Sequence, residues 1–111
     1  HFAGAFPTWL APTQVSIVPI SNEKHADFAE QVYKKMRAAG IRVKLDDRSE
    51  SMNYKIRESL QDKKIPYVCV IGDKEIEAGA VAVRKRGVGQ VGTKSVDEFI
   101  SEIEKEIKDR V

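Results

Sequence analysis

The sequence predicts an α/β domain in which helices pack on the faces of a mixed β-sheet. Short apolar runs rich in β-branched residues alternate with segments whose apolar residues recur every three or four positions. These segments follow the order strand, helix, strand, helix, two or three strands and a final helix. The 111 residues suffice for one core, and 41% hydrophobic and 32% charged residues are typical of a soluble globular domain.

Two strands and the helix between them are expected to begin the fold. Residues 14–20 form the first strand, with Pro19 near its end because proline has no N–H for a strand ladder. The apolar residues of 23–39 recur at helical spacing, and 41–45 alternate between apolar and basic. Because such β-α-β crossovers are right-handed, we expect these two strands to be parallel.

The next segments give a second helix, a buried strand and an antiparallel return. A helix is expected over about 51–63, and the continuous apolar run 65–71 predicts a central strand buried on both faces. The polar stretch from Gly72 to Gly79 is interpreted as a turn. The alternation in 80–86 then predicts a further strand.

The chain is expected to end in a Gly-rich connection and a helix. Residues 87–94 form the connection, with a short strand around Gln90–Val91. Ser95 and Glu98 match a capping box, and an apolar stripe follows them. The leading residues 1–13 contain two prolines and three aromatic side chains, which favours an ordered loop packed on the body.

The residues give no sign of catalysis. The glycines of "GVGQVG" (87–92) match a dinucleotide motif, but no strand with a ribose-binding acid follows the last helix, and Lys94 is displaced from its place in a phosphate loop. No metal site is expected, because the two histidines and Cys69 lack partners at ligand spacing. His25 is expected to face solvent, and Cys69 to be a buried thiol.

The acidic pair Asp46-Asp47 could serve acid–base chemistry, but such a pair is more often a solvated loop that starts a helix. No stretch approaches the length of a membrane span.

Local charge and small side chains point instead to RNA. The net charge is only +2, so any basic footprint must be local. Arg84 and Arg86 share one strand face with Ala82, a position of little bulk that a flat base can approach. Arginine can donate to guanine O6 or uracil O4, and the Glu75 carboxylate can accept from a guanine edge. Proteins read unstacked RNA bases on these edges.

Five phrases carry a resemblance to a known family: "GAFPTWLAP", "AAGIRVKLDDR", "YKIRE", "KIPYVCVIGDKE" and "GAVAVRKRG". In this order and spacing they resemble the C-terminal anticodon-binding domain of threonyl-tRNA synthetases, which are class IIa aminoacyl-tRNA ligases. The resemblance covers nearly the whole chain. It implies a five-stranded mixed sheet surrounded by three α-helices. Residues 1–13 would follow the catalytic domain, and 14–111 would form the anticodon-binding domain.

The resemblance also implies the ligand and the residues that contact it. The domain would bind the anticodon loop of threonine tRNA and read its second and third bases, G and U. By motif, Glu75 and Arg84 match the base-reading pair, and Arg57 matches a loop-contacting arginine. Further RNA-binding candidates are Ser49, Arg86 and Lys55. The family often has Asn at the position of Ser49 and usually has Gly at that of Asn53. The stretch from Glu58 to Ile65 is one residue longer than expected.

The same resemblance implies a cytoplasmic parent enzyme that is a homodimer and uses ATP, magnesium and zinc in other domains. The fragment itself would hold no cofactor, catalyse no reaction and bind neither DNA nor membrane. Two alternatives remain open: a small α/β nucleotide-binding domain, and a protein-interaction module that keeps the fold without RNA binding. Protection of the domain on adding ATP or NAD would indicate the nucleotide-binding domain. Absence of RNA affinity at any salt concentration would indicate the interaction module.

Overall fold

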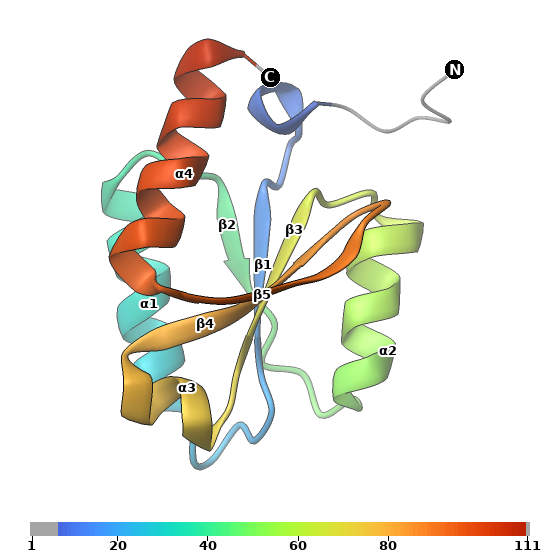
Figure 1. Cartoon of the computed structure of the whole chain (residues 1–111). Coiled ribbons are helices and arrows are strands. Elements are labelled where there is room, and N and C mark those ends of the chain that lie inside the picture. Colours follow the sequence, from blue (N-terminus) through green and yellow to red (C-terminus); the bar gives the residue numbers. More distant parts are fainter. Residues whose placement is uncertain (1–6, 111) are drawn as a thin grey trace.

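The computed structural model describes residues 7–110 as a five-stranded mixed sheet with helices on both faces (Figure 1). The strands are β1 (Val15–Pro19), β2 (Val43–Leu45), β3 (Tyr67–Ile71), β4 (Ala80–Lys85) and β5 (Gly89–Ser95). They lie in the order β2-β1-β3-β4-β5. β1 pairs in parallel with β2 and β3, whereas β3–β4 and β4–β5 are antiparallel. The predicted mixed sheet is confirmed.

Four α-helices surround this sheet: α1 (Ala26–Ala38), α2 (Met52–Arg57), α3 (Asp73–Ala78) and α4 (Val96–Asp109). Helices α1 and α4 lie on one face and α2 on the other, while α3 lies at the end of the sheet between β3 and β4 (Figure 1). The three predicted helices are present. The turn predicted from Gly72 to Gly79 is wrong, because this stretch forms α3. None of the described helices has the length and apolar character needed to cross a membrane.

Two apolar clusters hold the layers together, one on each face of the sheet. The larger cluster joins α1 and α4 to inward residues of β1, β3 and β4, including Ile17, Cys69 and Val83. The smaller cluster joins Ile56 of α2 to the opposite faces of β1 and β3. Because β3 contributes to both clusters, all five of its residues are buried, as predicted for a central strand.

Two elements differ in extent from the sequence prediction. Helix α1 begins at Ala26, three residues later than predicted, because residues 22–24 form a turn in which the Ser21 hydroxyl accepts from the Lys24 N–H at 3.2 Å. β5 runs from Gly89 to Ser95 and is much longer than the predicted short strand. Its glycines and mostly exposed polar side chains give no strand pattern in the sequence. The pairing with β4 shows that the segment is an edge strand.

The second helix changes its winding halfway. Helix α2 continues directly into a π-helical turn (η2, Glu58–Asp62), in which the Lys63 N–H donates to the Glu58 carbonyl at 2.9 Å. A π turn holds one more residue than an α turn. It therefore accommodates the extra residue that the sequence led us to expect between Glu58 and Ile65. Asn53, which stands where the family usually has Gly, lies in the regular part of α2 and has no positive φ.

The described part of the leading segment packs on the body, as predicted. It contains a short 3-10 turn (η1, Thr8–Leu10). The Arg42 guanidinium donates to the carbonyls of Ala11 and Trp9, each at 2.9 Å, and the Arg110 guanidinium lies 5.3 Å from the centre of the Trp9 ring. Residues 1–6 lie outside the described part of the chain.

Candidate nucleic-acid interface

The predicted base-reading strand, β4, presents two different faces. Val81 and Val83 are buried in the cluster formed with α1 and α4. Ala82 packs against the cluster of α2 on the opposite face, and by alternation Arg84 points to that side too. Both Ala82 and Arg84 are half-buried. The predicted separation of the valines from Ala82 and Arg84 is confirmed.

The neighbouring strand β5 extends this face as a low polar surface. Thr93 lies opposite Ala82 and Gln90 lies opposite Arg84, and both of these β5 residues are exposed. The register shifts between Val83 and Arg84, which marks a bulge. Bulges re-aim side chains and are common beside functional sites. Val91 is the extra residue, so the bulge lies in β5 and Arg84 keeps the regular alternation of β4.

The two arginines of this region differ in the contacts that they make within the protein. No described residue makes a hydrogen bond or ion pair with the Arg84 side chain. Its five N–H donors can therefore serve a ligand. Arg86 instead donates from Nη1 to the Lys64 carbonyl at 2.5 Å, and its backbone N–H donates to Pro66 at 2.9 Å. These bonds tie the start of the β4–β5 hairpin to the segment before β3.

Glu75 lies in the first turn of α3, and its carboxylate has a fixed direction. Its Oε1 atom accepts from the Gly72 N–H at 2.8 Å, a capping interaction. A Cβ at position 72 would lie 2.6 Å from Ile20 Cδ1 and 3.1 Å from Glu75 Oε1, so a larger residue there would displace the ends of these two side chains. A carboxylate has about four acceptor sites. The cap uses one of them, so Glu75 keeps the capacity to accept from a base.

Lys55 does not present a free cation. Its side chain is buried at 2% exposure, and Nζ donates to the Asp46 carbonyl at 2.9 Å. Met52, Lys55, Ile56 and Ser59 lie on the inward side of the helix, and the lysine stem packs there with them. This position argues against the direct RNA contact predicted for Lys55 and gives it a role in holding the loop before α2.

That loop, Asp46–Ser51, carries Ser49 and is held by ionic contacts that sequence reasoning missed. The buried Asp46 carboxylate pairs with Arg48 at 2.8 Å, and Arg48 also donates to Glu58 at 2.5 Å. The Arg48 hydrogen bonds hold the pKa of the Asp46 carboxyl below its ordinary value. The interpretation of Asp46 as a solvated residue is therefore wrong. The signal was the acid and base two positions apart, Asp-x-Arg.

The last two predicted residues are solvent-accessible. Ser49 is exposed at the tip of the loop, and Arg57 is exposed in the last turn of α2. Both lie on segments next to the α2 face of the sheet, the face that also presents Ala82 and Arg84. Ser49 and Arg57 therefore have the accessibility that a contact with an RNA loop requires.

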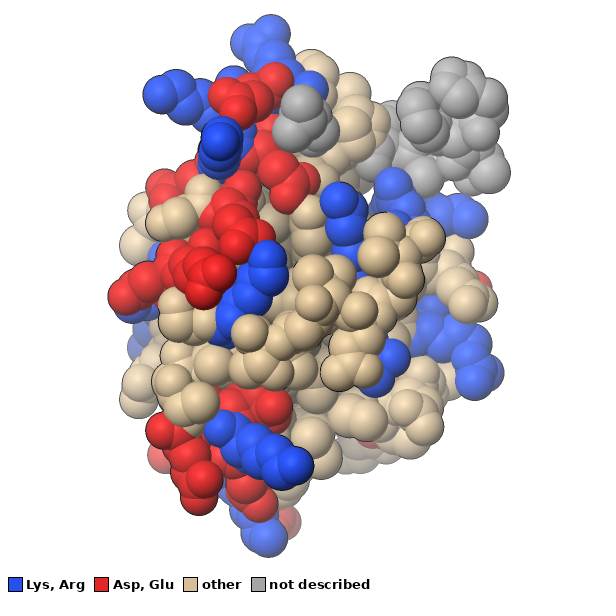
Figure 2. Space-filling model, viewed as in Figure 1, with Lys and Arg blue, Asp and Glu red and all other residues tan. Residues whose placement is uncertain are grey.

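Acidic and basic side chains lie mainly on different sides of the domain (Figure 2). α4 carries six acidic and two basic residues. Acidic side chains gather over α4 and α3 on the left of Figure 2, whereas basic side chains predominate on the side of α2. A phosphate backbone would therefore be attracted to the α2 side of the domain.

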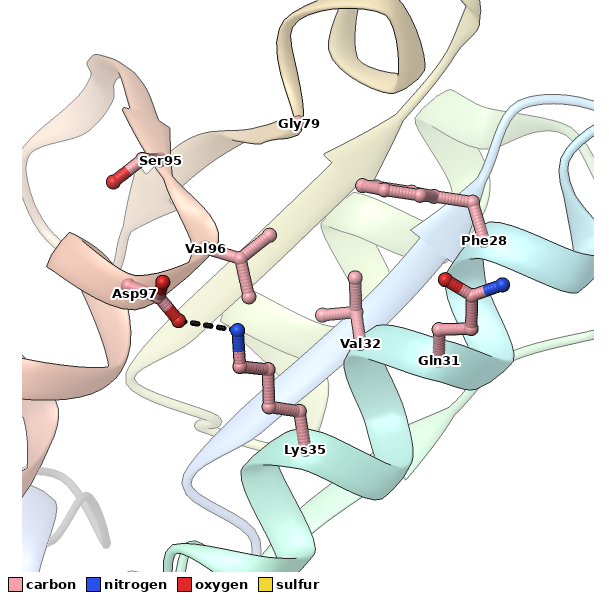
Figure 3. A pocket seen from close by; sticks show the side chains of 8 residues that line it. All are labelled: Phe28, Gln31, Val32, Lys35, Gly79, Ser95, Val96 and Asp97. Carbon is pink, nitrogen blue, oxygen red and sulfur yellow. Dashed lines mark ion pairs between the residues drawn. The ribbon is translucent and has the colours of Figure 1, made fainter.

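A groove of about 200 Å³ lies on the other face of the sheet, between α1 and the start of α4. Phe28, Val32 and Val96 give it apolar walls, and the Lys35–Asp97 ion pair crosses it (Figure 3). Its one lysine is thus already paired, and the groove lies away from Arg84. It contributes nothing to the candidate interface.

The Gly-rich stretch is a hairpin and not a nucleotide cradle. Gly87 and Gly89 have φ values of 80° and 99°, which turn the chain from β4 into β5. Gly92 lies within β5, opposite Val83. A phosphate loop leads directly into a helix, whereas here a paired strand intervenes. The connection predicted over residues 87–94 is therefore wrong for most of its length, because residues 89–95 form β5.

A comparison with families of known domains identifies the class to which this fold belongs. A family model described as "Anticodon binding domain" matches residues 14–106. The chain therefore belongs to the anticodon-binding domain family, as its sequence motifs implied.

Similar sequences narrow this assignment. The chain is 52% identical over 110 residues to a threonine–tRNA ligase of Carboxydothermus hydrogenoformans, and 54% identical over 110 residues to one of Desulforamulus reducens. Each comparison covers 99% of this chain but only 17% of the ligase. The resemblance to the threonyl-tRNA synthetase type of domain is thus confirmed, and the catalytic domain of these ligases lies in the remainder of their length.

Solved structures of two synthetases share this fold. The RNA binding domain of threonyl-tRNA synthetase from Cryptosporidium parvum Iowa II superposes with a TM-score of 0.87 at 32% identity, covering 95% of this chain and 26% of that chain. Prolyl-tRNA synthetase from Cryptosporidium parvum superposes with a TM-score of 0.81 at 28% identity, and the match covers 95% of this chain and 22% of that chain. The arrangement of sheet and helices is therefore shared between synthetases of different amino acids.

Proposed function

We propose that this domain binds the anticodon loop of threonine tRNA and reads its second and third bases, G and U. The proposal is carried by two observations: Arg84 has no partner among the described residues, and the Glu75 carboxylate is oriented by the Gly72 N–H. Arg84 projects from the open face of β4, and Glu75 lies in the helix that joins β3 to β4. Arginine donates to guanine O6 or uracil O4, and a carboxylate accepts from guanine N1–H and N2–H₂.

Ala82 and the β5 surface leave room for the bases on this face. In the proposed complex the splayed bases lie against Ala82 and Thr93, and Arg57 and Ser49 contact the loop backbone. Arg86 positions the hairpin and adds positive charge. Phosphate contacts fix the register of the RNA, and the base contacts specify its sequence.

By analogy with the ligases that it matches, we propose that the domain belongs to a cytoplasmic, homodimeric enzyme that attaches threonine to its tRNA. ATP, magnesium and zinc would be bound by other domains of that enzyme. The domain alone would bind tRNA without catalysis.

The test is the affinity for anticodon stem-loops that differ only in the second base, G or A. A good bidentate contact discriminates by about 1–3 kcal/mol, or about 5- to 150-fold. Arg84→Ala should remove most of the preference for G. Glu75→Gln should do the same while retaining the α3 cap, because glutamine also serves in a capping box. Arg37→Ala, an exposed arginine on α1, is the matched control.

The outcomes separate the competing functions. Binding with a G preference that depends on Arg84 and Glu75 supports anticodon reading. A preference that persists in Arg84→Ala contradicts the assignment of this face. Absence of RNA affinity at low salt indicates an interaction module that keeps only the fold.

A further inference from the structure

His25, predicted to face solvent, is buried at 4% exposure. Its Nδ1 atom accepts from the Ser21 N–H at 3.0 Å, so the neutral ring carries its proton on Nε2. Nε2 lies 2.8 Å from Asp73 Oδ1 and donates to it. The prediction of an exposed histidine is therefore wrong, because its partner lies 48 residues away in the sequence.

The sheet explains why these residues meet. Ser21 and His25 follow β1, and Asp73 follows β3. β1 and β3 are adjacent and parallel, with Pro19 opposite Ile71, so their carboxyl ends lie at the same edge of the sheet. The His25–Asp73 bond thus connects the loop before α1 to the first residue of α3.

Helix α3 has few other anchors. It is six residues long, and none of its side chains is fully buried. An isolated helix of this length is unstable in water, so tertiary contacts must fix its direction. Ile76 packs against the larger core cluster, and the Gly79 carbonyl accepts from the Val96 N–H at 3.3 Å. These contacts hold the middle and the end of α3, whereas the Asp73 bond holds its beginning.

We propose that His25 is a positioning residue that holds the first turn of α3, and thereby the Glu75 carboxylate, in the orientation needed to accept from a guanine edge. The inference rests on the proposed function of Glu75. Asp73 and Glu75 are two residues apart in the same turn, so freeing Asp73 lets the turn move and loosens the Gly72–Glu75 cap. The His25 hydrogen bond also holds the pKa of the Asp73 carboxyl below its usual range.

The test uses Asp73, because its side chain is 79% exposed and its replacement should not unfold the domain. Asp73→Ala removes the acceptor, whereas Asp73→Asn keeps an oxygen for Nε2–H and loses only the charge. Asp97→Ala is the matched control: it removes an aspartate that is also 79% exposed, also lies in the first turn of a helix and also pairs with a basic side chain, Lys35.

The readout is the ratio of affinities for stem-loops with G and with A at the second anticodon base. Asp73→Ala should lower the ratio at least about fivefold, which corresponds to losing one base contact. Asp73→Asn should keep the ratio within about twofold, and Asp97→Ala should leave it unchanged. Amide hydrogen exchange in α3 should become faster in Asp73→Ala only.

Each remaining outcome has one meaning. If Glu75→Gln loses the preference for G but Asp73→Ala retains it, the positioning role is overturned while the proposed function stands, whatever the exchange rates. An equal loss in Asp73→Asn and Asp73→Ala would mean that the charge acts, and not the bond to His25. If the unmodified chain shows no preference for G, the proposed function fails and the role of His25 fails with it.

Discussion

Replacing Lys55 by methionine tests whether its ammonium group stabilises the fold or contacts an RNA phosphate. Methionine keeps most of the buried stem, so the change removes the ammonium without opening a large cavity. It also leaves the Asp46 carbonyl without the donor that lies at 2.9 Å. Hydrogen bonds made by charged groups contribute about 1.5–3 kcal/mol, so we expect a loss of about 2 kcal/mol in the free energy of unfolding.

This loss is large enough to measure in a domain of this size. At about 2.1 cal/mol/K per residue, 111 residues unfold with an entropy of about 0.23 kcal/mol/K, so 2 kcal/mol lowers Tm by about 9 °C. Urea titration should show a lower midpoint with an unchanged slope. The salt dependence of stem-loop affinity should stay as in the unmodified chain, because a buried ammonium releases no counterion.

Lys63→Met is the control with the opposite expectation. Lys63 is exposed, with only a weak ion pair to Glu58 at 3.7 Å, so its loss should cost under about 0.5 kcal/mol. If Lys63 contacts one phosphate, the salt slope should fall by about 0.7. Our reasoning about Lys55 is refuted if Lys55→Met keeps its stability and lowers the salt slope as Lys63→Met does.

Two further predictions concern stability. The Asp46 carboxyl has a lowered pKa in the folded state, so its ion pair stabilises the domain fully above the unfolded pKa of about 3.9, and this stabilisation is lost as the pH falls through the folded pKa. The free energy of unfolding, measured between pH 6 and about pH 2, should therefore depend less steeply on pH in Asp46→Asn. An unchanged loss of stability in acid would contradict the assignment. Ser95 accepts from the Glu98 N–H at 3.1 Å as the N-cap of α4, so Ser95→Ala should lower the free energy of unfolding by about 1 kcal/mol, with Ser101→Ala in the exposed part of α4 as the control.

The strongly patterned elements could be predicted from the sequence. The apolar run that forms β3 and the capped stripe of α4 are local signals, and both proved correct. The length of β5 was underestimated because an edge strand with exposed polar side chains and two glycines shows no alternation of apolar and polar residues. Helix α3 resembled a turn because it is short and polar, although Gly72, Glu75 and Gly79 do supply its caps.

The sequence could propose residues of the candidate site only where the chemistry is local. Glu75 and Arg84 follow from their motif and their place at the β3–β4 connection. The burial of Lys55 could have been inferred, because it lies one helical turn from Met52 and Ser59 on the inward side of α2. The burial of His25 could not, since it depends on Asp73, which only the parallel pairing of β1 and β3 brings close.

The π turn at Glu58–Asp62 has a consequence for how this domain can vary. It lies between Arg57, which faces the proposed ligand, and the buried strand that begins at Tyr67. An additional residue is absorbed as a local widening of the helix, and the positions before and after it keep their places. We therefore expect a deletion of one residue at this point to turn the π turn into an α turn without shifting the register of the sheet or rotating the binding face.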